Sequence, residues 1–218
     1  MEHASRIMKS ISMISRMGGS RNAYSLLELL TIMVIMAVLA AGTLSSVSGL
    51  MDSVNISQGG QAFQDQLNLA RQIASAQNII VEVRCLKLLP LPQAPASGYT
   101  GVLLWSPARA APLSPVIRLP GAIAISQDTT TFSTLFGTYV SSGTMALSSE
   151  TTSYVSFTIN PSGMVGPLSS TASAPNMKST TVGIVPARLA STTSLSAVHN
   201  YMLVQINPIT CATLAYRP

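Results

Sequence analysis

Hydrophobic residues dominate the first of three stretches that differ in their pattern along the chain. Residues 24–44, YSLLELLTIMVIMAVLAAGTL, are almost uniformly apolar, and Glu28 is the one charged residue among them. An α-helix of this length rises about 31 Å at ~1.5 Å per residue, enough to cross the hydrocarbon core of a bilayer. The pattern therefore predicts a membrane-spanning helix over residues 24–44.

In the second stretch, residues 45–77, apolar residues recur at helical spacing with polar residues between them. These apolar positions are Val47, Met51, Val54, Phe63, Leu67, Ala70 and Ala74. We expect one long helix over residues 24–77, whose outer half is amphipathic and lies against a globular head. Gly59 and Gly60 either break this helix or give it a flexible joint, since glycine costs up to ~1 kcal/mol in a helix interior.

In the third stretch, from Ile79 onward, apolar residues alternate with other residues, as in β-strands. Strands are expected at residues 79–86, 99–105, 116–119, 122–125, 154–159, 182–185, 201–206 and 213–216. The alternation in residues 79–86 predicts a strand buried on both faces. The last two strands flank Asn207-Pro208-Ile209-Thr210 and are predicted to form a hairpin. Residues 127–153 are rich in Ser and Thr, and their pattern is weak.

The predicted fold class is α+β, with a long N-terminal transmembrane and amphipathic helix packed on an antiparallel β-sheet head. The predicted domains are a leader over residues 1–23, the helix over residues 24–77 and a β-rich head over residues 78–218.

The distribution of charged residues adds a prediction about cellular location. Only 9% of the residues are charged, against about 25% in a typical soluble protein, which argues against an ordinary cytosolic enzyme. Four of the 12 cations precede residue 22, which is typical of a cytoplasmic flank. We therefore expect a single-pass protein of the inner membrane, with its N-terminus in the cytoplasm and its head outside it, in the periplasm. The other cations are scattered, so no nucleic-acid partner is expected.

Glu28 separates three interpretations of the apolar stretch. They are a cleaved secretory signal, a plain anchor and a prepilin-type N-terminus. A carboxylate costs about 2.5–3.5 kcal/mol at the centre of a bilayer, and a signal or an anchor gains nothing from it. A subunit that packs helix against helix can pair it with a cation.

The N-terminal residues resemble the class III signal of type IV pilins and type II secretion pseudopilins. The likeness consists of a basic leader, Ala23, Tyr24, then Ser25-Leu26-Leu27, Glu28 and an apolar run. In that family a prepilin peptidase cuts after a small residue, usually Gly, and commonly methylates the new amine. The resemblance implies cleavage between Ala23 and Tyr24, although Ala23 replaces the usual Gly and the leader is long.

Cleavage there would leave an α-amine on Tyr24 at the positive end of the helix dipole. Glu28, one turn further on, could neutralise this amine in its own chain or in a neighbouring subunit. Pairing with a neighbour would also fix the axial register between subunits. The alternative is that Glu28 is a solvated carboxylate at the edge of the helix.

Three stretches resemble smaller groups within this family, the H-type minor pseudopilins and the pilin-like Verru_Chthon cassette protein D family. They are AYSLLELL, then GGQAFQDQLNLARQIASAQNIIVEVRCLKL, and the C-terminal YMLVQINPIT and YRP. Cys211-Ala212 stands where that family usually has Gly-Arg.

Catalytic chemistry has few candidate residues. His3 lies in the leader, His199 stands alone, and the acids after residue 23 are never closer than 13 residues in sequence. The sequence also lacks nucleotide-binding, nucleophile-elbow and zinc-binding motifs. We therefore expect no enzyme, no cofactor and no metal site. Cys85 and Cys211 either form a disulfide, worth about 4–5 kcal/mol on the loop-entropy model, or remain free buried thiols.

These observations predict a structural subunit, cut by a prepilin peptidase and assembled with other pilin-like subunits into a pseudopilus or type IV pilus-like fibre of a type II secretion-like system. Its expected partners are that peptidase, the other subunits and the inner membrane. The alternative is a secreted or membrane-anchored β-rich adhesin or binding protein with an ordinary signal sequence.

Overall fold

The computed structural model describes residues 25–88, 98–138, 140–147, 150–166, 180–193 and 198–217, without the side chains of residues 42–49 and 138. The chain divides into two compact units, Met1–Ser46 and Val47–Pro218.

Helix α2 covers Leu26–Gln77, 52 residues in all. It stops at Asn78, whose φ of 51° lies in the left-handed region that asparagine tolerates. The amide of Ile79 donates to the carbonyl of Ala74 over this turn at 3.2 Å, which is the Schellman pattern of a helix C-terminus. The chain then enters its first strand within three residues.

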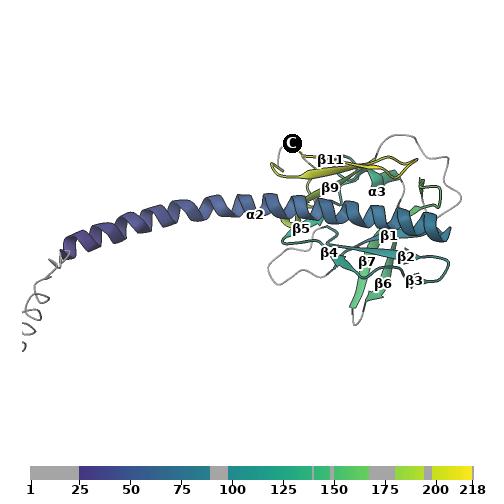
Figure 1. Ribbon diagram of the computed structural model, residues 1–218, viewed down its shortest axis with the longest axis horizontal. Helices are drawn as coiled ribbons and strands as arrows, with labels where there is room; N and C mark the ends of the chain where they lie inside the picture. The colour runs from purple at the N-terminus through teal and green to yellow at the C-terminus, as the bar shows by residue number, and fades with distance from the viewer. Residues whose placement is uncertain are drawn as a thin grey trace, which may run out of the picture. The chain divides into compact units, whose positions relative to one another are not determined.

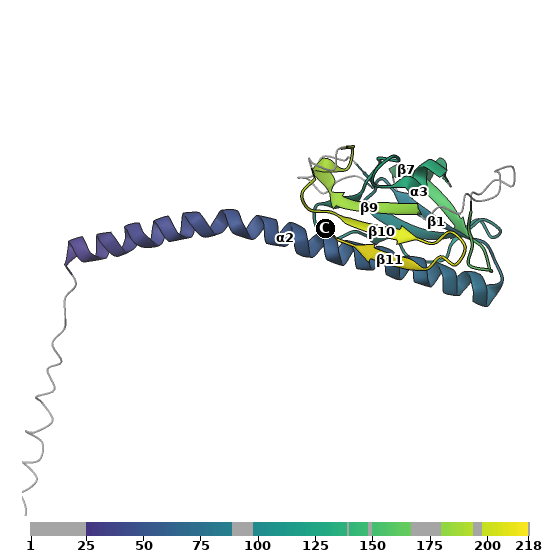
Figure 2. The same ribbon diagram turned by 90° about the horizontal axis from the view of Figure 1, so that it is seen from above.

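Two antiparallel sheets make up most of the second unit (Figures 1 and 2). Sheet A has the order β3-β2-β1-β7-β6, with β4 paired to β2 and β8 paired to β7. Its strands are β1 (Val81–Leu86), β2 (Gly101–Ser106), β3 (Ala111–Pro112), β4 (Ile117–Arg118), β6 (Ser141–Leu147), β7 (Glu150–Ile159) and β8 (Val165–Gly166).

Sheet B has the order β11-β10-β9-β5. Its strands are β5 (Ile123–Ile125), β9 (Thr180–Pro186), β10 (Met202–Ile206) and β11 (Thr213–Tyr216). Two short helices, α3 (Thr134–Thr138) and the 3₁₀ helix η1 (Ala187–Leu189), complete the described elements.

The main core forms where the later turns of α2 meet both sheets. Helix residues Ile56, Phe63, Leu67, Ala70 and Ala74 are all fully buried there. They share one cluster with apolar residues of β1, β2 and β7 from sheet A and of β5, β9 and β10 from sheet B. Figure 1 shows these turns of α2 lying across the two sheets. Each large apolar side chain buried here contributes about 1.5–3 kcal/mol.

The predicted fold class is wrong. Strands hold slightly more of the residues than helices, 35% against 33%, and they form two antiparallel sheets. The longest missed strand lies in residues 127–153, which form β6 and the start of β7, and the two-residue strands β3 and β8 were also missed. Side chains of β6 alternate between half-buried and exposed, so a strand with few large apolar residues is stable there. The structure is therefore predominantly a β-fold.

The predicted transmembrane segment and the inner-membrane localisation are also wrong. Among the described residues, we find no helix whose length and apolar character would allow it to cross a membrane.

Individual strands agree better with the sequence pattern. Strand β1 lies within residues 79–86 and is buried at all six positions, as predicted. Strands β10 and β11 pair as the predicted hairpin, with Ile206 opposite Thr213 at its closed end.

Candidate assembly surface

The start of helix α2 is capped by Ser25. The amide of Glu28 donates to Ser25 Oγ at 3.2 Å, and the amide of Leu29 donates to the Ser25 carbonyl at 3.2 Å. Ser25 and Glu28 have the spacing of a capping box, in which a serine and a glutamate three residues later satisfy free amides at a helix N-terminus. Sequence analysis missed this signal. The bond to Ser25 uses the backbone amide of Glu28 and not its carboxylate.

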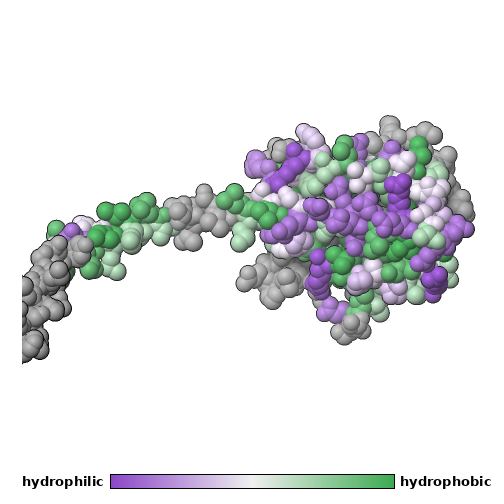
Figure 3. Space-filling view, viewed as in Figure 1, coloured by the Kyte–Doolittle hydropathy of each residue, from purple (hydrophilic) through white to green (hydrophobic). Residues whose placement is uncertain are grey.

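Beyond this cap, the first unit exposes large apolar side chains on every side of α2. Their exposed fractions run from 43% at Ile32 to 84% at Leu26. The eleven residues are Leu26, Leu27, Leu29, Leu30, Ile32, Met33, Val34, Ile35, Met36, Val38 and Leu39. We call this set the apolar segment (green in Figure 3). A helix that is apolar on all sides is normally buried, so another surface is needed to cover it.

Glu28 is the one charged residue between the first and last residues of the apolar segment. Glu28 itself is not one of the eleven residues but lies between Leu27 and Leu29. Its side chain is exposed, and it forms no ion pair with any residue that the structure describes. The next charged residue along the chain is Asp52. The predicted cleavage residues Ala23 and Tyr24 lie outside the described residues, so the predicted pairing with the Tyr24 amine remains a prediction.

In the second unit, polar contacts hold α2 against the head where it joins the sheets. Arg217 donates to Ser53, to Ser57 and, at 3.0 Å, to Asn200. Asp52 pairs with Arg188 at 3.5 Å. These contacts tie the C-terminal strand and helix η1 to one short stretch of α2.

Gly59 and Gly60 lie inside continuous helix and are buried, so they do not end one helix and begin another. A Cβ atom on Gly59 would come within 2.2 Å of Ile123 Cδ1, and one on Gly60 within 2.1 Å of Met202 Sδ. Glycine at these two positions lets the helix backbone approach β5 and β10 closely. This is a packing role, which differs from the expected flexible joint.

Cys85 and Cys211 are both buried and are free thiols in this structure. Burial raises the pKa of Cys85 far above its usual range. It also raises the pKa of Cys211 to about 11, although the charge of Arg71 acts to lower it. Both thiols therefore stay protonated near neutral pH, and a protonated thiol is a weak nucleophile.

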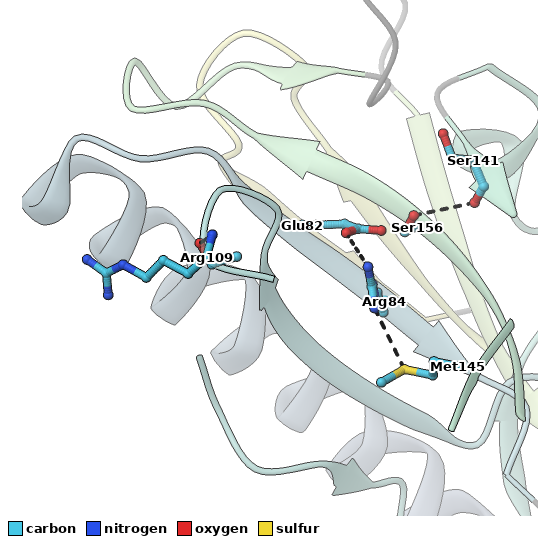
Figure 4. Close-up of polar contacts among 7 residues, drawn as sticks. Glu82, Arg84, Arg109, Ser141, Met145 and Ser156 are labelled. Carbon is cyan, nitrogen blue, oxygen red and sulfur yellow. Dashed lines mark hydrogen bonds and ion pairs between the residues drawn. The ribbon is translucent and has the colours of Figure 1, made fainter. Parts of the chain in front are cut away.

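The outer face of sheet A carries a buried ion pair that the sequence analysis did not single out (Figure 4). Arg84 Nη2 donates to Glu82 Oε2 at 2.8 Å, and the two side chains are only 11% and 2% exposed. The guanidinium carbon lies 4.2 Å from the ring centre of Trp105 and 4.4 Å from that of Tyr154. A carboxylate that is paired and enclosed in this way is poorly placed for acid–base catalysis.

Other reactive groups are also engaged in structure. Asp128 accepts hydrogen bonds from the amides of Thr130, Thr131 and Phe132 and from the Thr130 hydroxyl. Across the described residues, no three His, Cys, Asp or Glu side chains lie close enough to hold a metal ion. His199 is exposed.

Comparison of the chain with protein-family models, with curated proteins and with solved structures found no match in any of the three. The resemblance to pilins therefore depends on the sequence motifs alone. The exposed apolar segment is the feature of the structure that most needs a functional explanation.

Proposed function

We propose that this chain is a pilin-like structural subunit, cut between Ala23 and Tyr24 and assembled into a pseudopilus or type IV pilus-like fibre. In this proposal the apolar segment of α2 is buried against the same segment of neighbouring subunits. The observation that carries the proposal is the exposure of eleven large apolar side chains on all sides of one helix.

The free energy of burying the apolar segment favours several neighbouring helices over one. Covering each large apolar side chain contributes about 1.5–3 kcal/mol. A single partner helix covers one stripe of about a third of the helix surface. Because the apolar segment has no polar side, a pair of helices would leave much of it in water. A helical array, in which each helix has several neighbours, would cover it more completely.

In this arrangement Glu28 would determine the axial register between neighbouring subunits. An uncompensated carboxylate within a packed apolar bundle would be costly, because burial of an unpaired charge is strongly unfavourable. Cleavage before Tyr24 creates an α-amine about one helical turn from Glu28. Pairing of this amine with Glu28 of a neighbour would compensate both charges and select one axial register.

The rest of the molecule is consistent with a role that involves no catalysis. The carboxylates of Glu82 and Asp128 and both thiols are committed to the packed structure, as described above. Beyond the exposed Leu50, Met51 and Val54, the exposed side of α2 within the second unit is largely hydrophilic (Figure 3) and suits contact with water or with other heads. Its exposed residues include Gln58, Gln61, Asp65, Asn68 and Gln72.

N-terminal sequencing of the mature protein from producing cells tests the processing step. The proposal predicts a mature chain that begins at Tyr24. A start near Ala41 would remove most of the apolar segment and indicate a secreted β-rich binding protein. A start at Met1 would mean that the predicted cleavage does not occur. Either of these two results would contradict the proposal.

A further inference from the structure

A polar hollow opens between the two sheets at the end of the core. Strand β1 ends at Leu86, opposite Tyr154, whereas β7 begins four residues earlier, at Glu150. The β6–β7 ribbon therefore extends past the end of β1, its neighbour in sheet A. The hollow next to this extension has a volume of about 440 Å³, within the range of about 300–1,000 Å³ that is typical of small-molecule sites.

The second wall of the hollow is held by sheet B. Tyr99 forms a two-way backbone bridge with Ile125 of β5, at 3.0 and 2.8 Å. The amide of Gln127 donates to the Ala190 carbonyl at 2.9 Å. Tyr99 also packs edge-to-face on Phe136, with ring centres 5.6 Å apart. Both residues are therefore fixed by the fold, which gives the hollow a defined shape.

Seven residues with polar side chains line the hollow: Lys87, Tyr99, Gln127, Ser142, Thr144, Ser153 and Tyr154. The ring of Tyr154 contacts the guanidinium of Arg84. The other six side chains are available to a ligand, and those of Ser142, Thr144 and Ser153 are exposed. Among the described residues, none of these six side chains forms a hydrogen bond or an ion pair, and the hydrogen bonds of Lys87, Tyr99, Gln127 and Ser153 involve their backbones alone. A ligand could therefore use these groups without breaking any contact of the fold.

The chemistry of the lining indicates the class of ligand. Four hydroxyls and one amide each donate and accept hydrogen bonds, which matches a ligand that itself carries several hydroxyl groups. The half-buried ring of Tyr99 offers an apolar edge for the carbon face of a sugar. Lys87 brings one positive charge, and the described residues that line the hollow include no carboxylate to neutralise it.

We propose that this hollow binds an acidic saccharide, with Lys87 pairing the ligand's carboxylate and Ser142, Thr144, Ser153 and Gln127 bonding its hydroxyls. The site is independent of filament assembly, because every lining residue lies in the second unit and none belongs to the apolar segment.

Titration of the purified full chain with a D-glucuronate oligosaccharide, followed by calorimetry and ligand-observed NMR, tests this proposal. D-glucose and acetate serve as the comparison ligands. We expect saturable binding of the glucuronate ligand, weaker binding of glucose and no competition by acetate. Lys87→Gln should weaken glucuronate binding at least about tenfold, the loss expected for one hydrogen bond to a charged group, and leave glucose binding unchanged.

Two further variants keep the result interpretable. Thr144→Val combined with Ser153→Ala should weaken binding of both sugars, whereas Arg118→Gln, at an exposed cation on β4, should change neither. Thermal unfolding of each variant checks that the fold is intact. The proposal is overturned by the absence of saturable glucuronate binding, by binding that Lys87→Gln does not alter, or by acetate competing as well as glucuronate does.

Discussion

Arg84 donates a 2.8 Å hydrogen bond to Glu82, two residues earlier on β1. Both side chains lie on the outer face of sheet A, where neighbouring side chains bury them. Two aromatic rings enclose the guanidinium. Removal of one partner would leave the other charge buried and unpaired, which costs about 3–5 kcal/mol. Replacement of both partners by apolar residues removes the charges together.

We therefore predict that Glu82→Leu and Arg84→Met each lower the free energy of unfolding by about 3–5 kcal/mol, whereas the double variant loses far less. Chemical denaturation of the four chains as a double-mutant cycle measures this. Arg118→Met, at an exposed cation, is the control and should change stability by less than about 0.5 kcal/mol. Additive losses in the double variant would show that the pair is not coupled.

Glu28 has two candidate roles that a conservative substitution separates. Glu28→Gln keeps a side chain that suits the capping-box position but removes the charge, and Glu28→Leu removes both. If the charge pairs with a neighbouring subunit, both variants should fold normally and both should yield fewer fibres. Fibre yield by electron microscopy, with head stability by circular dichroism, checks this prediction.

Ser25→Ala is the matched control for Glu28, since it removes the cap at a cost of about 1 kcal/mol and leaves the charge. We expect this variant to assemble. Normal fibres from Glu28→Gln, together with a defect in Ser25→Ala, would assign Glu28 to capping instead.

Gly59 is predicted to tolerate no side chain, because its Cα lies against Ile123 in the core. Gly59→Leu should lower the free energy of unfolding by about 1–3 kcal/mol, the usual cost of overpacking. The neighbouring exposed Gln58→Leu keeps the same new residue on the same helix and should be close to neutral. Equal stability of the two variants would mean that the helix does not approach β5 as closely as described.

Asp128 is predicted to make stability depend on acid pH. Burial acts to raise the pKa of Asp128, but the hydrogen bonds from Thr130, Thr131 and Phe132 lower it by more, so the pKa lies below its usual value. The unfolded state then binds more protons in acid, so the stabilisation is present above the unfolded pKa of about 3.9 and is lost as pH falls through the folded value.

The free energy of unfolding should therefore fall as pH drops below about 4, and Asp128→Asn should reduce this slope. The same substitution should cost about 1–3 kcal/mol at neutral pH, because charged hydrogen bonds are lost. Glu150→Gln, at an exposed carboxylate, serves as the control. An Asp128→Asn variant with an unchanged acid slope would exclude this role.

The two thiols are predicted to be unreactive in the folded protein, because burial raises the pKa of both. Iodoacetamide at neutral pH should modify neither Cys85 nor Cys211 until the chain is unfolded, and should then modify both. Mass spectrometry without reducing agent gives the number of modified cysteines. Loss of the two thiol hydrogens from the untreated protein would instead demonstrate a disulfide.

Sequence patterns predicted the strands whose apolar residues alternate clearly, such as β1 and β10. They failed at β6, where Met145 and Leu147 are the only large apolar residues and the other side chains are small or hydroxylic. An edge ribbon of this kind is held by its backbone pairing with β7, a long-range contact that local periodicity does not report. The missed strands contribute to the strand content of 35%, which exceeds the helix content of 33% and contradicts the predicted fold class.

The candidate sites likewise include some features that the sequence reveals and others that depend on the three-dimensional fold. Glu28 was singled out because a lone charge in an apolar run is visible in the sequence, and Ser25 could have been found from its spacing to Glu28. The burial of Glu82 and Arg84 depends on Trp105 and Tyr154, which come from two other strands of the sheet. The polar hollow depends on how far β7 extends past β1, and sequence spacing alone could not reveal it.

The central claim is that the apolar segment is buried between subunits, and cysteine cross-linking within assembled fibres tests it most directly. Met33→Cys and Val38→Cys place new thiols on exposed positions of the segment, while the native cysteines are buried and give the background. The account predicts covalent dimers and higher species from both variants after oxidation of fibres, and none from the parent chain. Fibres that form normally but stay monomeric at both positions would contradict it.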